Sequence, residues 1–208
     1  MLRVIEEKQL RRVLRILLIV YKFGGNNHFI DSELRLQKIE FFFRNPDHFA
    51  YVLLNRFDKK ELSIPIEELK KIIIKLMQMD ELEIRIDSMR RFRYGAFEEL
   101  DKTLSILSSL LFMEIDKKEN HLKCTITELG IQYLKELEKE KELNWYFERI
   151  DLLYKFLEKL LPTALKNYQY LSKVYAATEW NYCIPNEING VKKMYKKLFN
   201  EELLCEGE

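Results

Sequence analysis

FEELDKTLSILSSLLFMEIDKKENHLKCTITELGIQYLKELEKE, residues 97–140, decides the predicted fold. Apolar residues recur at helical spacing up to Leu111, and the short runs 112–115 and 122–126 then predict two strands around the polar turn 116–120. A further helix begins near Thr127, with Thr125 or Thr127 as its candidate N-cap. This order is typical of the recognition end of a winged helix-turn-helix, with the turn as its wing. We therefore predict a mainly α fold: winged helix-turn-helix unit(s) with a small β-wing and a C-terminal helical extension.

The charge of this stretch argues against sequence-specific binding to DNA. Residues 97–140 carry ten acidic and six Lys or Arg side chains, a net charge of −4. A DNA-binding surface must neutralise phosphates, and an acidic recognition helix repels them. Lys117 and Lys118 on the wing are the candidate cations for a weak contact with nucleic acid. We expect the unit to bind protein, and any contact with DNA to be indirect.

Composition excludes several other classes of protein. The 208 residues have a formal net charge of +1, which indicates no general affinity for nucleic acid or for a membrane surface. The longest early apolar run, 16–20, is far shorter than the roughly 20 residues of a membrane span. Three scattered cysteines predict no disulfide framework and favour a reduced, cytoplasmic setting. The sequence has no phosphate-binding glycine loop and no zinc spacing, so we expect no cofactor, no metal and no enzyme activity.

The residues before the deciding stretch predict further helices. Helix 2–21 has an apolar face, and its arginines lie mainly off that face. We interpret them as the solvated side of the helix, with a patch for phosphate or an acidic partner as the alternative. Helices 33–44 and 46–57 follow, the first so apolar that it must be buried on more than one side. Residues 66–79 predict another helix, and residues 82–86 predict a short strand. We predict three domains: an N-terminal helical region, 1–60, which could be a degenerate helix-turn-helix, a winged-helix domain, 61–142, and a C-terminal helical extension, 143–208.

A family resemblance lies in RLQKIEFFFRNPDHFAYVLL, residues 35–54. A charged and apolar helix ends in aromatic residues and is followed by Arg-x-Pro and then by another apolar helix. The residues that carry the pattern are Arg35, Leu36, Lys38, Glu40, Phe41, Phe42, Arg44 and Pro46. The segment resembles the middle components of ABC-three-component systems, a group that includes the small subunits of Lamassu-type antiviral defence. The matching residues belong to a structural core and carry no catalytic chemistry.

The resemblance implies a non-catalytic connector subunit in an anti-phage or anti-plasmid defence complex. Its partners would be an SMC-like ATPase and an effector, often a nuclease, that responds to foreign DNA. The alternative from the residues alone is a winged-helix DNA-binding transcription regulator. A third alternative, a metal-dependent nuclease, rests on the spacing of Pro46-Asp47 and Asp58-Lys59-Lys60. We do not favour it, because the two acids lie at opposite ends of a predicted helix and nuclease carboxylates must converge on a metal ion.

Two more stretches are candidate contact surfaces. Arg90, Arg91 and Arg93 interleave with Phe92 and Tyr94, a combination that suits phosphate and stacked bases. The alternatives are a solvated loop with aromatic anchors, or a contact with an acidic protein. Downstream, a long periodic apolar stripe predicts either one helix over 127–161 or two helices with a bend, and the tyrosine-rich residues 163–178 predict a further helix. We predict a partner-helix interface on the stripe residues Tyr146, Phe147, Ile150, Tyr154 and Leu157.

Overall fold

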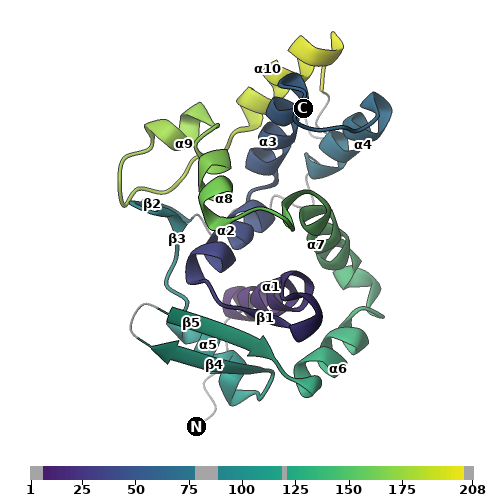
Figure 1. Ribbon diagram of the computed structural model, residues 1–208. Helices are drawn as coiled ribbons and strands as arrows, with labels where there is room; N and C mark the ends of the chain where they lie inside the picture. The colour runs from purple at the N-terminus through teal and green to yellow at the C-terminus, as the bar shows by residue number, and fades with distance from the viewer. Residues whose placement is uncertain (1–6, 78–88, 119–120, 204–208) are drawn as a thin grey trace. The chain divides into compact units, whose positions relative to one another are not determined.

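The chain forms two compact units, each built from two separate stretches of sequence. The computed structural model describes residues 7–77, 89–118 and 121–203 (Figure 1). Unit 1 comprises Met1–Phe43 and Glu98–Pro162, and unit 2 comprises Arg44–Phe97 and Thr163–Glu208. The fold is mainly helical with a small antiparallel sheet, as predicted. The units differ from the three consecutive domains predicted, because a strand near residue 30 pairs with one near residue 125 and joins distant stretches in one unit.

Unit 1 holds the stretch that decides the predicted fold. Its helices are α1 (Glu7–Phe23), α2 (Glu33–Arg44, whose last residue belongs to unit 2), α5 (Asp101–Ser109), α6 (Glu128–Leu137) and α7 (Asn144–Leu157). Short 3₁₀ turns occupy Gly25–Asn27 and Lys141–Leu143, and the strands are β1 (Phe29–Ile30), β4 (Met113–Lys118) and β5 (His121–Ile126). The helix, strand pair and closing helix expected from residues 97–140 are therefore present, and α6 and α7 are two helices rather than one.

The sheet of unit 1 has the strand order β1–β5–β4 and is antiparallel throughout. Cys124 of β5 lies between Ile30 of β1 and Ile115 of β4. The sequence did not predict β1, because two residues are too short for a period-two pattern. The turn before β1 needs a glycine: a Cβ on Gly24 would lie 2.5 Å from both the Val20 carbonyl and the Phe29 amide nitrogen.

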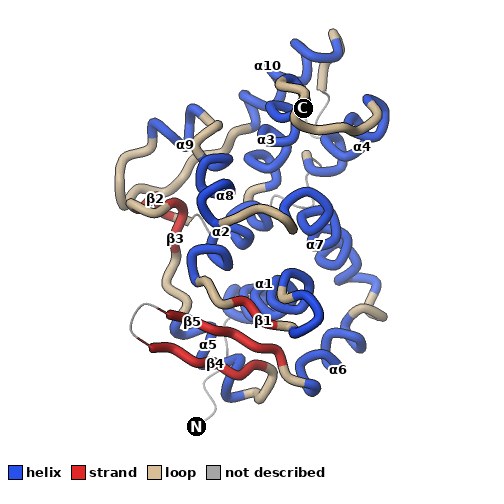
Figure 2. The backbone as a smooth tube through the Cα atoms, in the orientation of Figure 1, coloured by secondary structure: helices blue, strands red, loops and turns tan. Residues whose placement is uncertain are grey.

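Helix α1 is the centre of unit 1. It contacts β1, β5, α5, α6 and α7 (Figure 2). Its apolar run from Ile16 to Val20 is buried, so this run is core rather than membrane anchor. No helix in the described part of the chain has the length and hydropathy needed to cross a membrane.

Unit 2 consists of helices and one β-hairpin. The elements are α3 (Pro46–Asp58), α4 (Ile66–Leu76), β2 (Arg90–Phe92), β3 (Gly95–Phe97), α8 (Pro162–Gln169, which begins at the last residue of unit 1), α9 (Lys173–Ala177) and α10 (Ile188–Phe199). Helix α3 packs against α4 and α10, and the rings of Phe57 and Phe199 lie 6.2 Å apart. Pro46 stands at the first turn of α3, where its missing N–H costs no hydrogen bond.

Two predictions for unit 2 need correction. The helix expected over 163–178 is broken into α8 and α9, because the Ser172 side chain accepts a hydrogen bond from the Tyr175 amide (3.0 Å) and so begins a new helix. Residues 90–97, expected as a loop and a helix start, form the β2–β3 hairpin. Gly95, which directly follows the two-residue loop Arg93–Tyr94, has a φ of 114°, a backbone conformation that glycine adopts without strain. The predicted strand 82–86 lies outside the described residues.

Candidate functional site

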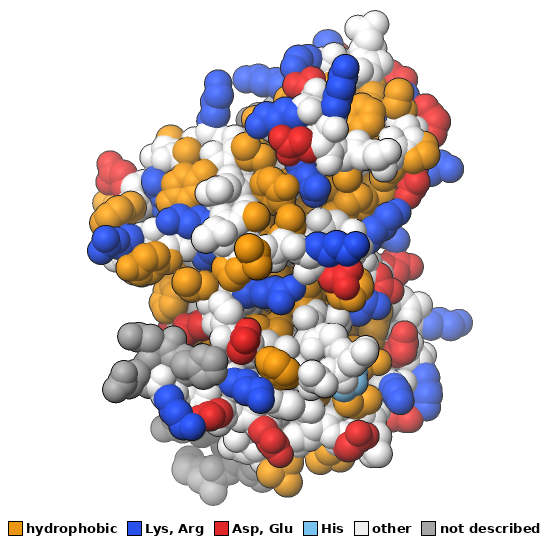
Figure 3. Space-filling model, viewed as in Figure 1, with side chains coloured by type: hydrophobic (Ala, Val, Ile, Leu, Met, Phe, Trp, Pro, Cys, Tyr) orange, Lys and Arg blue, Asp and Glu red, His pale blue; other side chains and the backbone are white. Residues whose placement is uncertain are grey.

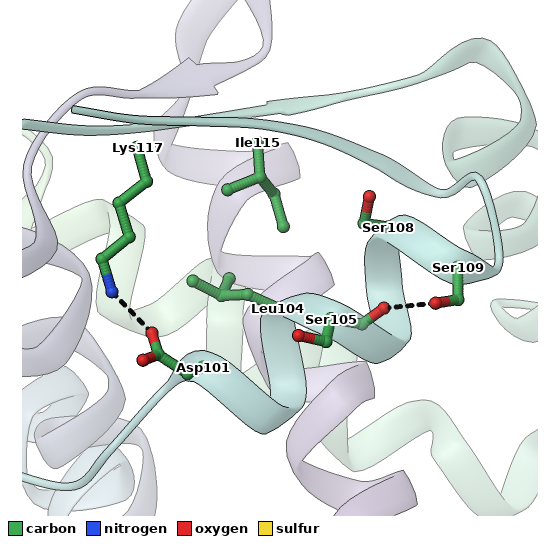
Figure 4. A pocket seen from close by; sticks show the side chains of 7 residues that line it. All are labelled: Asp101, Leu104, Ser105, Ser108, Ser109, Ile115 and Lys117. Atoms are coloured by element: carbon green, nitrogen blue, oxygen red, sulfur yellow. Dashed lines mark hydrogen bonds and ion pairs between the residues drawn. The ribbon is translucent and has the colours of Figure 1, made fainter.

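A shallow groove of about 580 Å³ lies between α5 and β4 in unit 1. Small and polar side chains predominate in its lining, which consists of Asp101, Leu104, Ser105, Ser108, Ser109, Ile115 and Lys117. Figure 4 shows Lys117 extending from β4 toward Asp101 on α5. The groove therefore lies between the predicted recognition helix and the strand that leads into the wing.

The lysines at this groove are paired with carboxylates. Lys117 Nζ lies 2.6 Å from Asp101 Oδ1, and this hydrogen bond raises the pKa of the lysine. Lys118 Nζ lies 3.4 Å from Asp116 Oδ2 on the same strand. Both lysines are exposed, as a contact with phosphate would require, but each positive charge has an adjacent negative one. The pairing reduces the attraction of the groove for phosphate and leaves a nearly neutral polar surface.

A buried ion pair fixes the residues that immediately precede α5. Arg12 of α1 binds both carboxylate oxygens of Glu40 on α2, at 3.1 and 3.3 Å. The same guanidinium donates to the carbonyls of Glu98 and Glu99, at 3.2 and 2.6 Å. Gln37 holds the backbone of Glu98 from the other side: its amide donates to the carbonyl (2.7 Å), and its oxygen accepts from the N–H (3.2 Å). Side chains of α1 and α2 thus fix the start of α5 and the groove beside it.

The interpretation of the α1 arginines as a solvated face is wrong for two of them. Arg12 and Arg15 are buried, with Arg15 only 1% exposed, and both face Glu40. The phosphate-patch alternative fails for Arg12 and Arg15 for the same reason. Burial of these cations requires a partner charge, which Glu40 supplies from 28 positions beyond Arg12. A helical pattern read alone cannot reveal a partner at that separation.

The residues that carry the family resemblance are almost all buried. Those with exposures of 2% or less are Leu36, Lys38, Glu40, Phe41, Phe42 and Arg44, and Pro46 is also buried. Arg35 is half-buried, and its guanidinium donates to the Glu158 carbonyl at 2.8 Å. Apart from the half-buried Arg35, the residues of the pattern are therefore part of the structural core.

The partner-helix interface predicted on α7 is contradicted by burial. Tyr146, Ile150 and Leu157 are buried inside unit 1, and Phe147 and Tyr154 are partly buried. Helix α7 packs on α1, and the Tyr154 ring meets the Phe23 ring at 5.4 Å. The apolar stripe is thus covered by this chain's own helices rather than left for another protein.

The basic cluster lies on the β2–β3 hairpin of unit 2. Arg90 and Arg93 are exposed, and Arg91 is half-buried. Arg91 donates to the carbonyls of Ala176 (2.8 Å) and Thr178, and Arg90 donates to the Asn181 side chain at 3.3 Å. The cluster is therefore divided: Arg91 attaches the hairpin to its surroundings, whereas Arg90 and Arg93 are presented to solvent.

Sequence reasoning missed the residues that lie beside this hairpin. Lys166 of α8 donates to the Arg93 carbonyl at 3.2 Å, and its ammonium group lies 5.8 Å from the Tyr170 ring centroid. The segment after α9 hydrogen-bonds to β2, since the Arg91 amide donates to the Tyr182 carbonyl at 3.0 Å. These residues are separated from the hairpin by about 70 to 90 positions. Gly95 was the one local signal of a hairpin here, and nothing local identified its neighbours.

Asp47 and Asp58, the acids on which the nuclease alternative depends, do not lie close enough to share a metal ion. Asp47 is buried and accepts a hydrogen bond from the Glu187 amide, whereas Asp58 pairs with Lys197 at 2.8 Å. They lie 11 residues apart on α3, about 16 Å at 1.5 Å per residue. No group of three or more His, Cys, Asp or Glu side chains within the described ranges is placed to hold a metal ion.

A buried polar cluster surrounds Asp47 in unit 2. Ser172 donates to the Glu187 carboxylate, and the His48 ring contacts the Pro185 carbonyl at 2.9 Å through Nε2. Glu187 precedes α10 and Ser172 precedes α9, so the cluster joins the starts of three helices, including α3. Its side chains are buried, and Ser172 caps α9, whereas the Glu187 side chain makes no cap hydrogen bond to α10.

The comparisons with known proteins give no relative. No protein-family model matches the chain, and no curated protein or solved structure matches it either.

Proposed function

We propose that unit 1 is a winged helix whose second and third helices are separated in sequence by an insertion. The order α1, β1, α2, α5, β4, β5 is that of a winged helix in which α5 is the recognition helix and β4–β5 is the wing. The strand order β1–β5–β4 supports this assignment. The insertion is the part of unit 2 that lies between α2 and α5, residues 45–97.

We further propose that the protein is a non-catalytic connector subunit whose winged helix binds protein. The observation that carries this proposal is the Lys117–Asp101 pair in the α5–β4 groove. A helix and wing that read DNA need uncompensated cations, whereas a protein partner can be bound through a neutral polar groove with apolar elements such as Leu104 and Ile115. The resemblance of residues 35–54 to the middle components of ABC-three-component systems suggests the partners: an SMC-like ATPase and an effector nuclease, in the cytoplasm.

Co-purification with the ATPase tests this function. The partner would be sought among neighbouring genes that encode a large coiled-coil ATPase, and co-expressed with the tagged full chain. We expect a stable complex that Ser105→Trp weakens at least ten-fold, because the indole fills the groove. Lys102→Trp is the matched control, since Lys102 is exposed on α5 but does not line the groove. Failure of two folded proteins to associate would refute the proposal, and equal binding by both variants would place the contact elsewhere.

The second candidate is a winged-helix transcription regulator. The observation in its favour is the exposure of the two wing lysines, 47% for the Lys117 side chain and 79% for that of Lys118. It predicts sequence-selective binding of duplex DNA that weakens steeply with salt and is reduced by Lys117→Ala with Lys118→Ala. A mobility-shift assay at low and high salt separates the two functions, because the connector function predicts no sequence selectivity.

A further inference from the structure

Cations and aromatic rings alternate along one face of unit 2. The Arg91 guanidinium lies 5.2 Å from the Tyr170 ring centroid, and the Lys166 ammonium lies 5.8 Å from that same ring. Lys166 is also 5.9 Å from the Tyr94 ring, over which Arg93 lies at 5.6 Å. We call the series Arg91, Tyr170, Lys166, Tyr94 and Arg93 the basic-aromatic ladder. Each spacing is within the range of a cation–π contact.

The ladder is held in place by hydrogen bonds at both ends. At one end the Arg91 backbone exchanges hydrogen bonds with the segment after α9: its N–H donates to Tyr182 and its carbonyl accepts from Asn181 at 2.7 Å. At the other end Lys166 donates to the Arg93 carbonyl. Because the hairpin is fixed to two other segments, its outer side chains are positioned before any ligand arrives, which lowers the entropy cost of binding.

Large aromatic side chains in the ladder and beside it are exposed. Tyr94 is 58% exposed, Trp180 is 62% and Tyr182 is 63%, and Phe92 is also exposed. Hydrophobic and Lys or Arg side chains gather on the part of the surface formed by α8, α9 and the hairpin (Figure 3). A surface of exposed rings next to cations is unlike the neutral α5–β4 groove, and it marks an interaction site.

The local charge strongly favours an anionic ligand. Segments 89–97 and 163–183 together contain five cationic side chains and a single acid, Glu179. Their net charge is +4, whereas the whole chain carries +1. These two segments are thus more positive than the chain as a whole.

We propose that this face of unit 2 binds single-stranded nucleic acid. Arg90, Arg93 and Lys166 would neutralise backbone phosphates, while Tyr94, Trp180 and Tyr182 would stack on unpaired bases. A duplex fits less well, because its bases are already stacked and offer no free faces to these rings. An acidic peptide would use the cations but would leave the rings without a matching partner. The inference goes beyond the proposed function and does not rest on it, since all its residues lie in unit 2.

Fluorescence anisotropy with the full chain tests the inference. The probes are a labelled oligothymidylate of about 20 nucleotides, a duplex of equal length and a polyglutamate peptide. We expect the oligothymidylate to bind most tightly and its affinity to fall with salt, with a slope of about 0.7 per phosphate neutralised. Arg93→Ala should lower that slope by about 0.7. Lys135→Ala, a matched change on the exposed face of α6 in unit 1, should leave it unchanged.

Ring stacking is tested separately from charge. Tyr94→Ala should weaken binding of the oligothymidylate about ten-fold, and Tyr94→Phe should restore it, because stacking needs the ring and not the hydroxyl. In a Trp145→Phe background Trp180 is the sole tryptophan, and its fluorescence should be quenched by the oligothymidylate but not by polyglutamate.

Three results would overturn the inference. Duplex binding as tight as single-strand binding would indicate a charge-only contact. Polyglutamate binding without oligothymidylate binding would assign the face to an acidic protein. Oligothymidylate binding that Arg93→Ala and Tyr94→Ala both leave unchanged would locate the nucleic-acid site elsewhere. None of these results affects co-purification with the ATPase, so this inference and the connector function can fail independently.

Discussion

The arginines of α1 and those of the β2–β3 hairpin come from similar sequence but lie in opposite environments. LRRVLR in α1 and RRFR in the hairpin both mix Arg with apolar residues. Arg12 and Arg15 are buried against Glu40, whereas Arg90 and Arg93 are exposed. The difference arises from what the fold brings to each cluster: a buried carboxylate on α2 in the first case, exposed rings and further cations in the second. The same residue type therefore supports the fold in unit 1 and presents charge in unit 2.

Among the predictions that compare the interior of unit 1 with the surface of unit 2, cysteine reactivity has the largest expected effect. Cys124 is buried in the sheet of unit 1, where burial, aided by the charge of Glu33, raises its pKa to about 12. Cys183 is exposed and pairs with Arg90 through a β-bridge. In a Cys205→Ser background at pH 8, we expect a thiol reagent to label Cys183 at once. Cys124 should react at least about a thousand times more slowly, because its shift of about three pKa units removes that much thiolate.

The same cysteine predicts alkaline destabilisation with a definite sign. The folded-state pKa of Cys124 lies above the ordinary value of 9.0, so its neutral form contributes stability in full below pH 9. That contribution falls as the pH rises from 9 toward 12, because the unfolded chain loses the proton first. Cys124→Ala should remove this part of the pH dependence in urea unfolding. Rapid labelling of Cys124 in the native protein at pH 8 would contradict its placement in the sheet.

Glu40→Gln should cause the next largest effect, a loss of about 3–5 kcal/mol in the free energy of unfolding. The change leaves the charges of Arg12 and Arg15 buried without their carboxylate. Glu136→Gln on α6 is the matched control, because Glu136 pairs with Lys139 in an exposed contact of the kind that contributes about 0.5 kcal/mol or less. Urea unfolding followed by circular dichroism measures both. Equal losses would mean that Glu40 is not the counter-charge of the α1 arginines.

Gln37→Ala is expected to cost less, about 1–3 kcal/mol. The substitution leaves the N–H and the carbonyl of Glu98 without the hydrogen bonds that Gln37 makes to both. Gln37→Glu sharpens the test: it keeps an acceptor for the Glu98 N–H but removes the donor to its carbonyl. Because Gln37 is buried, the new carboxylate also pays a desolvation cost and repels the Glu98 carbonyl oxygen, so the loss of unfolding free energy, measured by urea titration, should exceed that of Gln37→Ala. A loss below about 0.5 kcal/mol for Gln37→Ala would show that water replaces both hydrogen bonds.

The contrast between the two arginine clusters also shows which features the sequence could predict. Local patterns identified α2, α3, α4 and the β4–β5 strand pair, because each needs only its own periodicity and end residues. Thr127 is the N-cap of α6, with its hydroxyl accepting from the Gly130 amide at 3.1 Å, as one of two candidates predicted. The winged-helix assignment and the family membership stay predictions.

Features that depend on distant residues were not predictable from local pattern. The apolar stripe of α7 was assigned to another protein because the sequence does not show that α1 covers it. The burial of Arg12 depends on Glu40, and the basic-aromatic ladder depends on Lys166 and Tyr170 meeting a hairpin far earlier in the chain. Charge and hydrophobicity belong to the residue itself, whereas its burial depends on the other residues that the fold brings around it.

Arg93→Ala has the smallest expected effect on stability and so separates the two clusters most cleanly. Arg93 is exposed, and its cation–π contact is with Tyr94, itself 58% exposed. Removing the guanidinium should change the free energy of unfolding by no more than about 0.5 kcal/mol, against the several expected for Glu40→Gln. The same change should weaken binding of single-stranded oligothymidylate about ten-fold, since a guanidinium beside a ring both neutralises phosphate and stacks. If Arg93→Ala instead destabilised the fold as Glu40→Gln does, the hairpin arginines would be structural too, and the contrast between the two clusters would disappear.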